Sequence, residues 1–448
     1  MSLQFITGNS GNGKTKYLFN RIVKEAKANP RDNYLVIVPE QFTMQTQRQL
    51  VDLSENKAIM NIDVLSFKRL AYRVFDELGI TNLTVLEETG KNLVLRKLAA
   101  QEADKLGVIG RNLNRIGYIS EVKSLLSELV QYNISPEELG RYIASGRLSD
   151  TLSDKLKDVL VLYEAFEKFM QDKYITAEEI LNELSNVAEE SAILRNSVIA
   201  FDEFTGFTPI QNQLIKKLFV ISKKIYVTLT IDCREDIFKS RGMQELFDMP
   251  KRTVKSLTEM AAFYGIEVEE PIILDKNYRL TENEELSFME QQLFRKRRGS
   301  FKKAPKHIHI DCLRDPKQEL TKIARRINEL VRNENLRYRD IAIVTGDVNI
   351  YAGYVREIFD KYNIPYFIDA TQEILFHPFI EFIRSIPDIA AQNFSADAVF
   401  RFLRCGFTEL LDSEIDVLEN YVLACGVRGK SAWDKKWVRL PKHKAGYD

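Results

Sequence analysis

The sequence predicts an α/β protein with two parallel-sheet domains, the second incomplete, and with helical insertions. Two observations support this fold class. Short apolar segments alternate with helical segments near the N-terminus and again from residue 307, and a long stretch between them, residues 86–190, has almost no strand-like runs. The length of 448 residues is enough for about two to four domains.

The first domain is predicted from five short apolar runs, each suited to a buried strand. These runs cover residues 3–7, 34–41, 61–67, 197–204 and 224–232. A helix is expected over residues 14–28, after the first run, and another over residues 68–78, after the third. Because strands that alternate with helices indicate a parallel sheet, we assign residues 1–85 and 191–290 to this domain.

The stretch over residues 86–190 is predicted to be a helical insertion. Its apolar residues recur at helical spacing, as at Ile119, Val122, Leu125, Leu126 and Leu129. Two helix starts are explicit, because Ser135 and Thr176 are each followed three residues later by a glutamate, the pattern of a capping box. Pro136 adds to the first of these signals, since proline is favoured at the first helical position.

A second alternating set predicts the start of another parallel-sheet domain over residues 291–376. Its expected strands are HIHIDCL (307–313), DIAIVTGD (340–347) and IPYFID (364–369). A helix is expected over residues 316–333 and another before the third strand. Three strands are too few to close a full sheet, and residues 377–448 look helical again, as the start of an accessory domain. The chain is therefore expected to be a fragment or truncated product of a longer protein.

The composition argues against several classes of protein. Lys and Arg number 64 and Asp and Glu number 64, so nucleic-acid binding through bulk charge is not expected, although a local basic groove is compatible with this balance. No apolar run approaches the roughly 20 residues of a membrane span, and no signal peptide fits before the first strand, so we expect a cytoplasmic location. The scattered cysteines indicate reduced thiols and no metal site: Cys233, Cys312, Cys405 and Cys425.

The first strand and helix flank GNSGNGKT (8–15), which fits the phosphate-binding pattern G-x-x-x-x-G-K-[ST]. Glycines let the backbone N–H groups of such a loop turn inward around a phosphate, and this loop contains Gly8, Gly11 and Gly13. Lys14 is then expected to reach the β- and γ-phosphates of ATP, and the hydroxyl of Thr15 to bind Mg²⁺. The loop thus predicts ATP and Mg²⁺ as cofactors.

A nucleotide site also needs a carboxylate at the end of a neighbouring strand, and VIAFDEF (198–204) supplies Asp202 and Glu203. Asp202 is expected to hold Mg²⁺, directly or through water, and Glu203 to polarise a hydrolytic water as the candidate catalytic residue. Alone, such a pair can equally be a strand-end turn with solvated acids; together with the loop, the functional interpretation is favoured. The large insertion between the two motifs is typical of helicases rather than of small nucleotide kinases.

In this order the motifs resemble those of superfamily 1 helicases. LSFKRLAYRVF (65–75) resembles the T-F-H-x-L-A-x-R segment of that family, and VPEQFT (38–43) lies where another DNA-contacting motif belongs. The resemblance implies RecA-like domains, and contacts with DNA from six residues: Pro39, Gln41, Phe42, Ser66, Phe67 and Lys68. LDKNYRL (274–280) resembles the L-x-x-N-Y-R segment, which implies that Tyr278 stacks on adenine and that Arg279 faces the phosphates.

More specifically, the chain resembles the AddB family, which forms one half of the bacterial AddAB ATP-dependent helicase–nucleases. FTGFTPIQ, RYRDIAIVTGD and DVLENYVLACGVRGK extend the match in order along essentially the whole chain. The resemblance implies that this chain is the N-terminal region of such a protein and that its partner in a heterodimer is a helicase–nuclease A subunit. It implies binding of double- and single-stranded DNA in double-strand break repair. It also implies a contribution to Chi recognition. It also implies that the nuclease domain and its iron–sulfur cluster lie outside this chain.

Three departures from the helicase pattern indicate an impaired motor. Where active helicases have G-D-x-x-Q, IDCRED (231–236) supplies Asp232 but places Glu235 at the glutamine position, and a carboxylate cannot donate a hydrogen bond to a γ-phosphate. AIVTGD (342–347) lacks the arginine that the family usually carries there. The arginine motif that completes hydrolysis would lie beyond residue 448.

Three groups of residues leave alternatives open. Phe42 and Phe67 are as compatible with core packing as with stacking on DNA bases. His307, His309 and Cys312 are close in sequence, but two histidines on one face of a strand are expected there rather than a metal site. A basic run is either a solvated linker or a contact with the DNA backbone: Arg295, Lys296, Arg297, Arg298, Lys302 and Lys303.

Three functions are compatible with these residues: the AddB-type region, an autonomous superfamily 1 P-loop ATPase or DNA translocase, and a binding module whose nucleotide site is structural. Glu235 and the incomplete second domain count against the autonomous motor. The intact pairs Lys14–Thr15 and Asp202–Glu203 count against an inactive site. We therefore expect the chain to bind ATP and Mg²⁺ but to show little DNA-stimulated ATP hydrolysis or unwinding.

Overall fold

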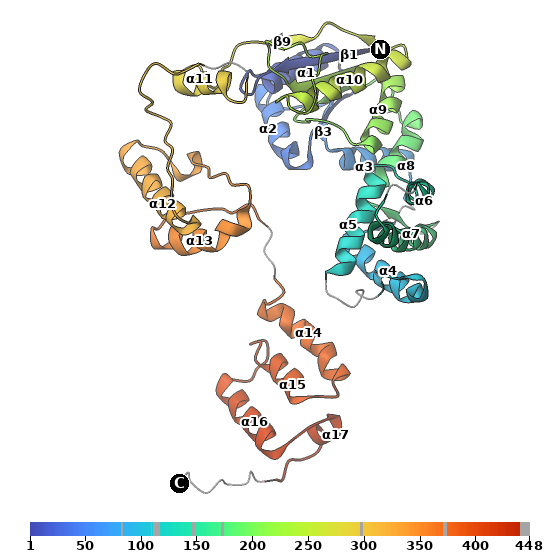
Figure 1. The fold of residues 1–448 in the computed structure, drawn as a ribbon, viewed down its shortest axis with the longest axis vertical. Coiled ribbons are helices and arrows are strands. Elements are labelled where there is room, and N and C mark those ends of the chain that lie inside the picture. Colours follow the sequence, from blue (N-terminus) through green and yellow to red (C-terminus); the bar gives the residue numbers. More distant parts are fainter. Residues whose placement is uncertain are drawn as a thin grey trace. The chain divides into compact units, whose positions relative to one another are not determined.

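The computed structural model describes residues 1–81, 84–108, 110, 117–145, 148–171, 174–295, 299–370 and 374–439. The chain divides into two compact units, Met1–His309 and Ile310–Asp448 (Figure 1). Each unit has hydrophobic cores of its own.

A parallel sheet forms the centre of unit 1. Its strands are β1 (Ser2–Gly8), β2 (Tyr34–Ile37), β3 (Ile62–Leu65), β6 (Val198–Phe201), β7 (Lys224–Thr230), β8 (Glu267–Val268) and β9 (Ile272–Leu274). They lie in the order β3-β2-β6-β7-β1-β8, and β9 also pairs with β1. All pairs are parallel, so the five strands predicted for the first domain and their parallel pairing are confirmed. The strands β8 and β9 were not predicted because each is too short to show a pattern.

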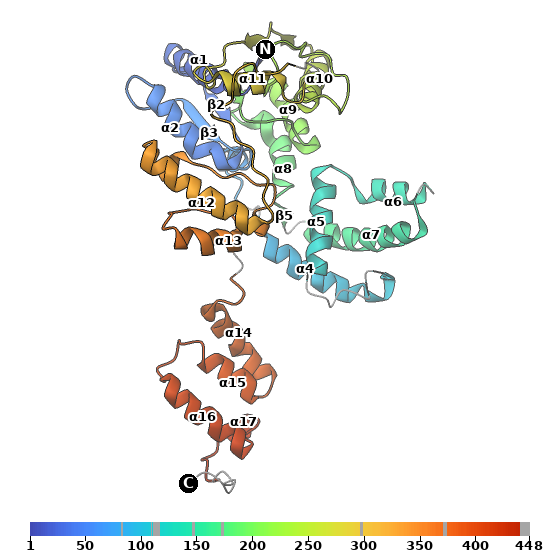
Figure 2. The ribbon, with the colours of Figure 1, turned by 60° about the vertical axis from the view of Figure 1, so that its left-hand side comes forward.

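Helices cover both faces of this sheet, which gives three layers (Figure 2). One face is covered by α1 (Lys14–Ala28) and α2 (Thr43–Leu53), and the other by α3 (Phe67–Leu78), α8 (Ile180–Val187), α9 (Pro209–Ile221) and α10 (Asp248–Phe263). Successive residues of β1 show the division, because Ile6 packs with the first set and Phe5 with the second. A strand buried on both faces reads as a continuous apolar run, which is why the sequence revealed it.

The helical insertion of unit 1 has a separate core. It consists of α4 (Glu88–Gln101), α5 (Tyr118–Gln131), α6 (Pro136–Ala144) and α7 (Asp150–Met170), with the short parallel pair β4 (Val85–Leu86) and β5 (Ile175–Thr176). Leu95, Leu126 and Leu162 are among its buried residues. The last helix in the predicted range, α8, differs, because Ile180 and Leu184 are buried in the core of the sheet.

The two capping signals have different outcomes. The hydroxyl of Ser135 accepts a hydrogen bond from the backbone N–H of Glu138 at 3.3 Å, and Pro136 is the first residue of α6. At the second site, the N–H of Glu179 donates to Thr176 Oγ1 and the N–H of Thr176 donates to Glu179 Oε2, at 3.2 and 2.6 Å. These reciprocal bonds close a turn, and α8 begins only after it, at Ile180.

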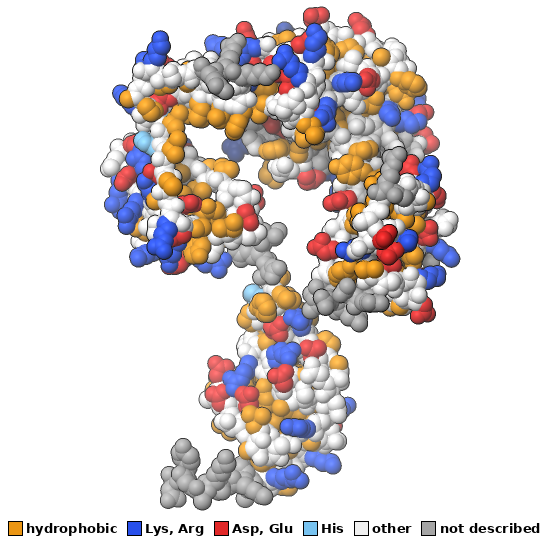
Figure 3. All heavy atoms as spheres, viewed as in Figure 1, with side chains coloured by type: hydrophobic (Ala, Val, Ile, Leu, Met, Phe, Trp, Pro, Cys, Tyr) orange, Lys and Arg blue, Asp and Glu red, His pale blue; other side chains and the backbone are white. Residues whose placement is uncertain are grey.

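The remaining elements of unit 1 are short. The helix α11 (Glu284–Gln292) follows β9, and 3₁₀ turns are formed by Glu40–Phe42, Ala103–Lys105 and Ala188–Glu190. No helix among the described residues of either unit is long and apolar enough to cross a membrane. On the face of unit 1 in Figure 3, Lys and Arg side chains are interspersed with Asp and Glu side chains, as the balanced charge leads one to expect.

The regular elements of unit 2 are all helices in the part of the chain that the structure describes. Its helices are α12 (Pro316–Asn333), α13 (Val348–Lys361), α14 (Pro378–Ala391), α15 (Ala396–Leu403), α16 (Asp412–Cys425) and α17 (Lys430–Trp433), with a 3₁₀ turn at Tyr338–Asp340. Leu320 of α12 packs with Phe359 of α13 in one core, and Phe400 of α15 packs with Ile415 of α16 in another.

The predicted second sheet is wrong for the described residues. The segments 307–313, 340–347 and 364–369 contain no strand, and apolar side chains that a sheet would bury are exposed, with Ile310 and Val344 each 93% exposed. An apolar run becomes a strand only when neighbouring strands accept and supply its backbone hydrogen bonds. The helices α12 and α13 do form, because an amphipathic helix makes its backbone hydrogen bonds internally.

Candidate nucleotide and DNA site

The loop between β1 and α1 has the backbone shape that its glycines permit. Gly11 and Gly13 have φ angles of 88° and 79°, in the left-handed region that side chains other than glycine rarely adopt. Space is also restricted, because a Cβ atom at Gly11 would lie 2.8 Å from Cβ of Arg279. The helix α1 begins directly at Lys14, so the loop delivers backbone N–H groups at a helix N-terminus.

The ammonium group of Lys14 is held by the loop itself. Its Nζ donates hydrogen bonds to the carbonyl oxygens of Gly8 and Asn9, both at 3.1 Å. Burial lowers the pKa of Lys14, against the effect of the nearby Asp202 and Glu203 carboxylates, which raise it. The loop therefore contains a desolvated amine whose present partners are neutral carbonyls, and a phosphate oxygen is a stronger acceptor for a charged amine than a carbonyl.

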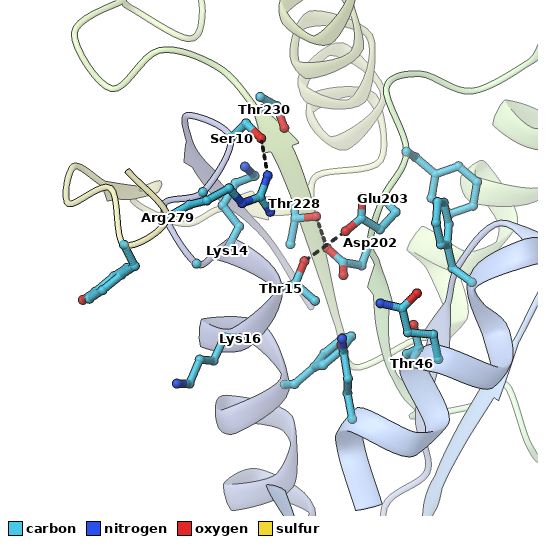
Figure 4. A pocket seen from close by; sticks show the side chains of 18 of the residues that line it. Ser10, Lys14, Thr15, Lys16, Thr46, Asp202, Glu203, Thr228, Thr230 and Arg279 are labelled. Atoms are coloured by element: carbon cyan, nitrogen blue, oxygen red, sulfur yellow. Dashed lines mark hydrogen bonds between the residues drawn. The ribbon is translucent and has the colours of Figure 1, made fainter. Parts of the chain in front are cut away.

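The predicted acidic pair lies at the end of β6, opposite the start of α1 (Figure 4). Asp202 is 1% exposed and accepts a hydrogen bond from Thr228 Oγ1 through its Oδ1. Glu203 follows with a φ of 64°, strain of a kind that tends to occur at functional sites. The hydroxyl of Thr15 donates to Glu203 Oε1 at 3.3 Å, so helix start and strand end meet at these side chains.

These residues fit a bound Mg²⁺ ion. The Oδ2 atom of Asp202 is buried and accepts no hydrogen bond from the part of the chain that the structure describes. Burial raises the pKa of Asp202, with Thr228 opposing the shift. A buried carboxylate oxygen with no donor, near the hydroxyl of Thr15, is the kind of oxygen ligand that a hard divalent cation prefers.

The segment that contains Tyr278 and Arg279 lies on the phosphate loop. The N–H of Tyr278 donates to the carbonyl of Gly11 at 3.0 Å, and Arg279 Nη1 donates to Ser10 Oγ at 3.4 Å. Asn277, which sequence reasoning did not single out, donates from Nδ2 to the carbonyl of Ser10 at 2.9 Å. Tyr278 is 65% exposed, so one face of its ring is accessible to a ligand.

A cavity of about 930 Å³ connects these parts. The predicted nucleotide-site residues that line it, together with the candidate catalytic Glu203, are Gly11, Gly13, Lys14, Thr15, Asp202, Tyr278 and Arg279. Gly8 does not line the cavity but accepts a hydrogen bond from Lys14. Sequence reasoning missed the lining residues from β7 and α2, because no motif marks them: Gln45, Thr46, Gln49, Asp52, Leu53, Thr228 and Thr230.

The two candidate DNA loops are joined by Glu40. Its carboxylate accepts a hydrogen bond from the hydroxyl of Ser66 and pairs with Nε of Arg69 at 3.1 Å. Ser66 is buried and caps α3, whereas Gln41 and Lys68 are exposed. Pro39 is half-buried beside them. Glu40 lies within the VPEQFT motif but was not among the predicted DNA-contact residues, yet it joins the 38–43 and 65–75 segments into one surface.

The two phenylalanines on these loops have different surroundings. Phe67 is 7% exposed and its ring stacks on Phe201 at a centroid distance of 5.8 Å, with Phe204 and Phe207 also in contact. Phe67 is therefore packed in the core, which is one of the two interpretations that the sequence left open. Phe42 is half-buried and lines the nucleotide cavity, so part of its ring is accessible.

The charged side chains of the segment after β7 form ion pairs with other side chains of unit 1. Asp232 is 2% exposed and pairs with Nη2 of Arg234 at 2.6 Å and with Nη1 of Arg295 at 2.7 Å. Burial opposes ionisation, but the bonds from Arg234 prevail and lower the pKa of Asp232. Glu235 pairs with Nζ of Lys251 at 2.6 Å and is absent from the lining of the cavity.

Three residues of the basic run, Arg295, Lys302 and Lys303, are among those that the structure describes. Arg295 is held within unit 1, with its side chain 10% exposed, and Lys303 pairs with Glu284 at 2.5 Å. Lys302 is exposed. Lys296, Arg297 and Arg298 lie outside the described residues. Arg295 is therefore neither a solvated linker residue nor a free contact for DNA phosphates.

The chain is similar to a known family and to several curated proteins. The family model described as "ADDB, N-terminal" matches residues 5–290. The B subunit of the ATP-dependent helicase/deoxyribonuclease of Lachnoclostridium phytofermentans is 39% identical over 100% of this chain and 39% of its own length. The proteins of the same name from Clostridium acetobutylicum and Clostridium tetani are each 34% identical over 98% of this chain. The chain spans 38% of the length of each of these two relatives.

Proposed function

Because the chain belongs to the AddB N-terminal family, we propose that it is the helicase-like region of an AddB-type protein, and that it binds ATP, Mg²⁺ and DNA. Its role would be in the processing of DNA double-strand breaks for recombinational repair in the cytoplasm, together with a helicase–nuclease A subunit. The observation that carries the nucleotide part is the convergence of Lys14, Asp202 and Tyr278 on one cavity from segments far apart in sequence.

Each part of the cavity has a role in this proposal. The backbone of Gly11 and Gly13 and the ammonium of Lys14 hold the phosphates. Thr15 and Asp202 hold Mg²⁺, which would neutralise phosphate charge. The exposed ring of Tyr278 stacks on adenine, as the family resemblance implies, and Arg279 beside Ser10 faces the phosphates.

Hydrolysis is proposed to be weak. Glu203 is positioned to polarise a water, because its carboxylate reaches Thr15 at the cavity wall. However, Glu235 is paired with Lys251, so the position that carries a phosphate-sensing glutamine in active helicases supplies no donor to the cavity. We propose that nucleotide occupancy, rather than a full hydrolytic cycle, is what this region contributes.

DNA is proposed to contact the surface formed by the 38–43 and 65–75 segments. Gln41 and Lys68 are exposed there and can bind phosphates or base edges without selecting a sequence. A contribution to Chi recognition remains part of the proposal, on the family resemblance alone. The nuclease chemistry and the iron–sulfur cluster are assigned to parts of the longer protein outside these 448 residues.

The test compares Lys14→Ala with Lys24→Ala, an exposed lysine on the same helix. Titration with a fluorescent ATP analogue should show Mg²⁺-dependent binding by the wild type and by Lys24→Ala, and none by Lys14→Ala. Circular dichroism should show the same helical content in all three. Equal thermal shifts on ATP addition in Lys14→Ala and wild type would contradict the proposal.

An autonomous ATPase or DNA translocase is the second candidate, and the complete set of Lys14, Thr15, Asp202 and Glu203 around one cavity favours it. Single-stranded DNA separates the two functions. Under the first proposal, DNA leaves ATP turnover by the 448-residue chain near its basal rate. Strong DNA stimulation or unwinding of a duplex would favour the second.

A further inference from the structure

The short helix α11 contacts two segments of unit 1 that have no common motif. One is the phosphate loop. The other is residues 299–307, here termed the strap. The strap runs toward the end of unit 1 at His309. Glu290, near the C-terminal end of the helix, contacts the loop, whereas Glu284, Glu285 and Phe288 contact the strap.

The loop end of α11 is a nearly buried polar cluster. Glu290 Oε1 accepts hydrogen bonds from Asn9 Nδ2 and from Arg295 Nη2, both at 2.8 Å. Arg295 also pairs with the buried Asp232, and Asn9 Oδ1 accepts from the N–H of Cys233 at 3.1 Å. Because Asn9 is 6% exposed and the side chains of Arg295 and Glu290 are 10% and 24% exposed, separating these hydrogen-bonded groups is costly.

The strap is held by α11 at three places along the helix. Glu285, which is 8% exposed, accepts the backbone N–H groups of Lys306 and His307 at 2.6 and 2.8 Å. Glu284 pairs with Lys303, and the rings of Phe288 and Phe301 are 5.5 Å apart. A displacement of α11 would therefore change the hydrogen bonds of the strap backbone.

Asn9 connects this helix to the phosphate site. Its carbonyl oxygen accepts from Lys14 Nζ, and its side chain donates to Glu290. The same carbonyl also accepts from the N–H of Asn12 at 3.2 Å, so a phosphate that takes over the ammonium of Lys14 leaves it with one donor instead of two. Loss of the charged donor weakens the hydrogen bonding that holds the Asn9 peptide in place. The side chain of the same residue transfers that change to Glu290.

We propose that α11 couples occupancy of the phosphate loop to the strap, with Asn9 and Glu290 as positioning residues. This inference rests on the proposed nucleotide binding. It gives the nucleotide site an effect on the chain that leads out of unit 1 even where hydrolysis is weak. Glu290 does not line the cavity, so its role is to position Asn9 rather than to contact ligand.

Hydrogen–deuterium exchange of the full 448-residue chain tests the coupling, with ATP and Mg²⁺ at concentrations that saturate each variant. In the wild type, exchange at the Lys306 and His307 amides should change by about tenfold on binding, equivalent to roughly 1.4 kcal/mol of altered protection. Glu290→Ala should lose this response. Glu282→Ala, an exposed carboxylate just before α11, is the matched control and should keep it.

Glu290→Gln provides the second variant, because its amide oxygen still accepts from Asn9 but carries no charge for Arg295. It should retain most of the response if the Asn9 bond carries the coupling. Unchanged exchange in a wild type that demonstrably binds ATP, or a full response in Glu290→Ala, would overturn the inference and leave the proposed function standing. Absence of ATP binding in the wild type would instead overturn the proposed function.

Discussion

The carboxylate of Glu235 pairs with Nζ of Lys251 at 2.6 Å, and the lysine side chain is only 4% exposed. Lys251 also pairs with Glu245 at 3.2 Å, so Glu235 belongs to a structural ion cluster beside α10. The sequence indicated that a carboxylate at this position cannot donate a hydrogen bond to a γ-phosphate. The structure shows in addition that the side chain is held by Lys251, which supports the proposal that Glu235 has no catalytic role.

Restoring the helicase residue at this position should therefore not restore the motor. Glu235→Gln is expected to leave ATP turnover unchanged and to reduce the free energy of unfolding by about 1 kcal/mol, because an ion pair with a buried lysine is lost while Glu245 remains. Steady-state turnover and urea unfolding measure the two effects. Glu245→Gln should destabilise comparably. A large gain in DNA-stimulated turnover would show that residue 235 can reach the nucleotide.

Asp202→Asn should stabilise the nucleotide-free protein at neutral pH while weakening Mg²⁺-dependent ATP binding. Burial raises the pKa of Asp202, so its ionisation costs folding free energy above that pKa, a cost absent at low pH where folded and unfolded forms are both protonated. Asparagine keeps an acceptor for Thr228 without the charge. The gain at neutral pH should shrink as the pH falls through the raised pKa and disappear where the folded and unfolded forms are both protonated.

Thermal midpoints between about pH 4 and 8 check this pH dependence. Asp76→Asn, at an exposed position on α3, is the control and should show no comparable gain. A gain for Asp202→Asn that is the same at every pH would mean that desolvation of the carboxylate is not its origin.

Alanine substitutions of the two loop phenylalanines should affect different properties, folding stability for Phe67 and DNA binding for Phe42. Phe67→Ala removes a ring from a buried aromatic cluster and is expected to cost about 3–5 kcal/mol of folding free energy. Phe42→Ala should cost much less, because the ring is only half-buried, and should weaken single-stranded DNA binding by about 1–3 kcal/mol if it stacks on a base. Urea unfolding and fluorescence anisotropy measure these outcomes. Unchanged DNA affinity in Phe42→Ala would remove Phe42 from the proposed surface.

Lys68→Ala should weaken single-stranded DNA binding independently of sequence. Lys68 is exposed at the start of α3, so a contact with phosphate would release counterions. The slope of log affinity against log salt should become shallower by about 0.7 on its loss. Lys24→Ala, on the opposite face of the sheet, serves as the control. The same slope in Lys68→Ala and wild type would place the DNA elsewhere.

Much of unit 1 could be predicted because its signals are local. The phosphate loop needs glycine where φ is positive, as at Gly11 and Gly13, and doubly buried strands appear as continuous apolar runs. The same local reasoning predicted strands in unit 2 that the described residues do not form. The sequence shows that these segments are apolar. Whether an apolar segment forms a strand depends on hydrogen bonds with neighbouring strands, and a local sequence pattern does not show whether those strands are present.

What the sequence alone determined is therefore the set of chemical groups and the short-range geometry that presents them: the phosphate loop, the acidic pair at the end of β6 and most helix positions. What only the tertiary structure decided is which groups meet. Asn9 reaches Glu290, and Glu40 reaches Ser66, without a motif that links them. These contacts follow from the packing of α11 beside the phosphate loop and of β3 beside β2. Hydrogen bonds between residues that are remote in sequence are specified by such packing, and not by the spacing of the residues along the chain.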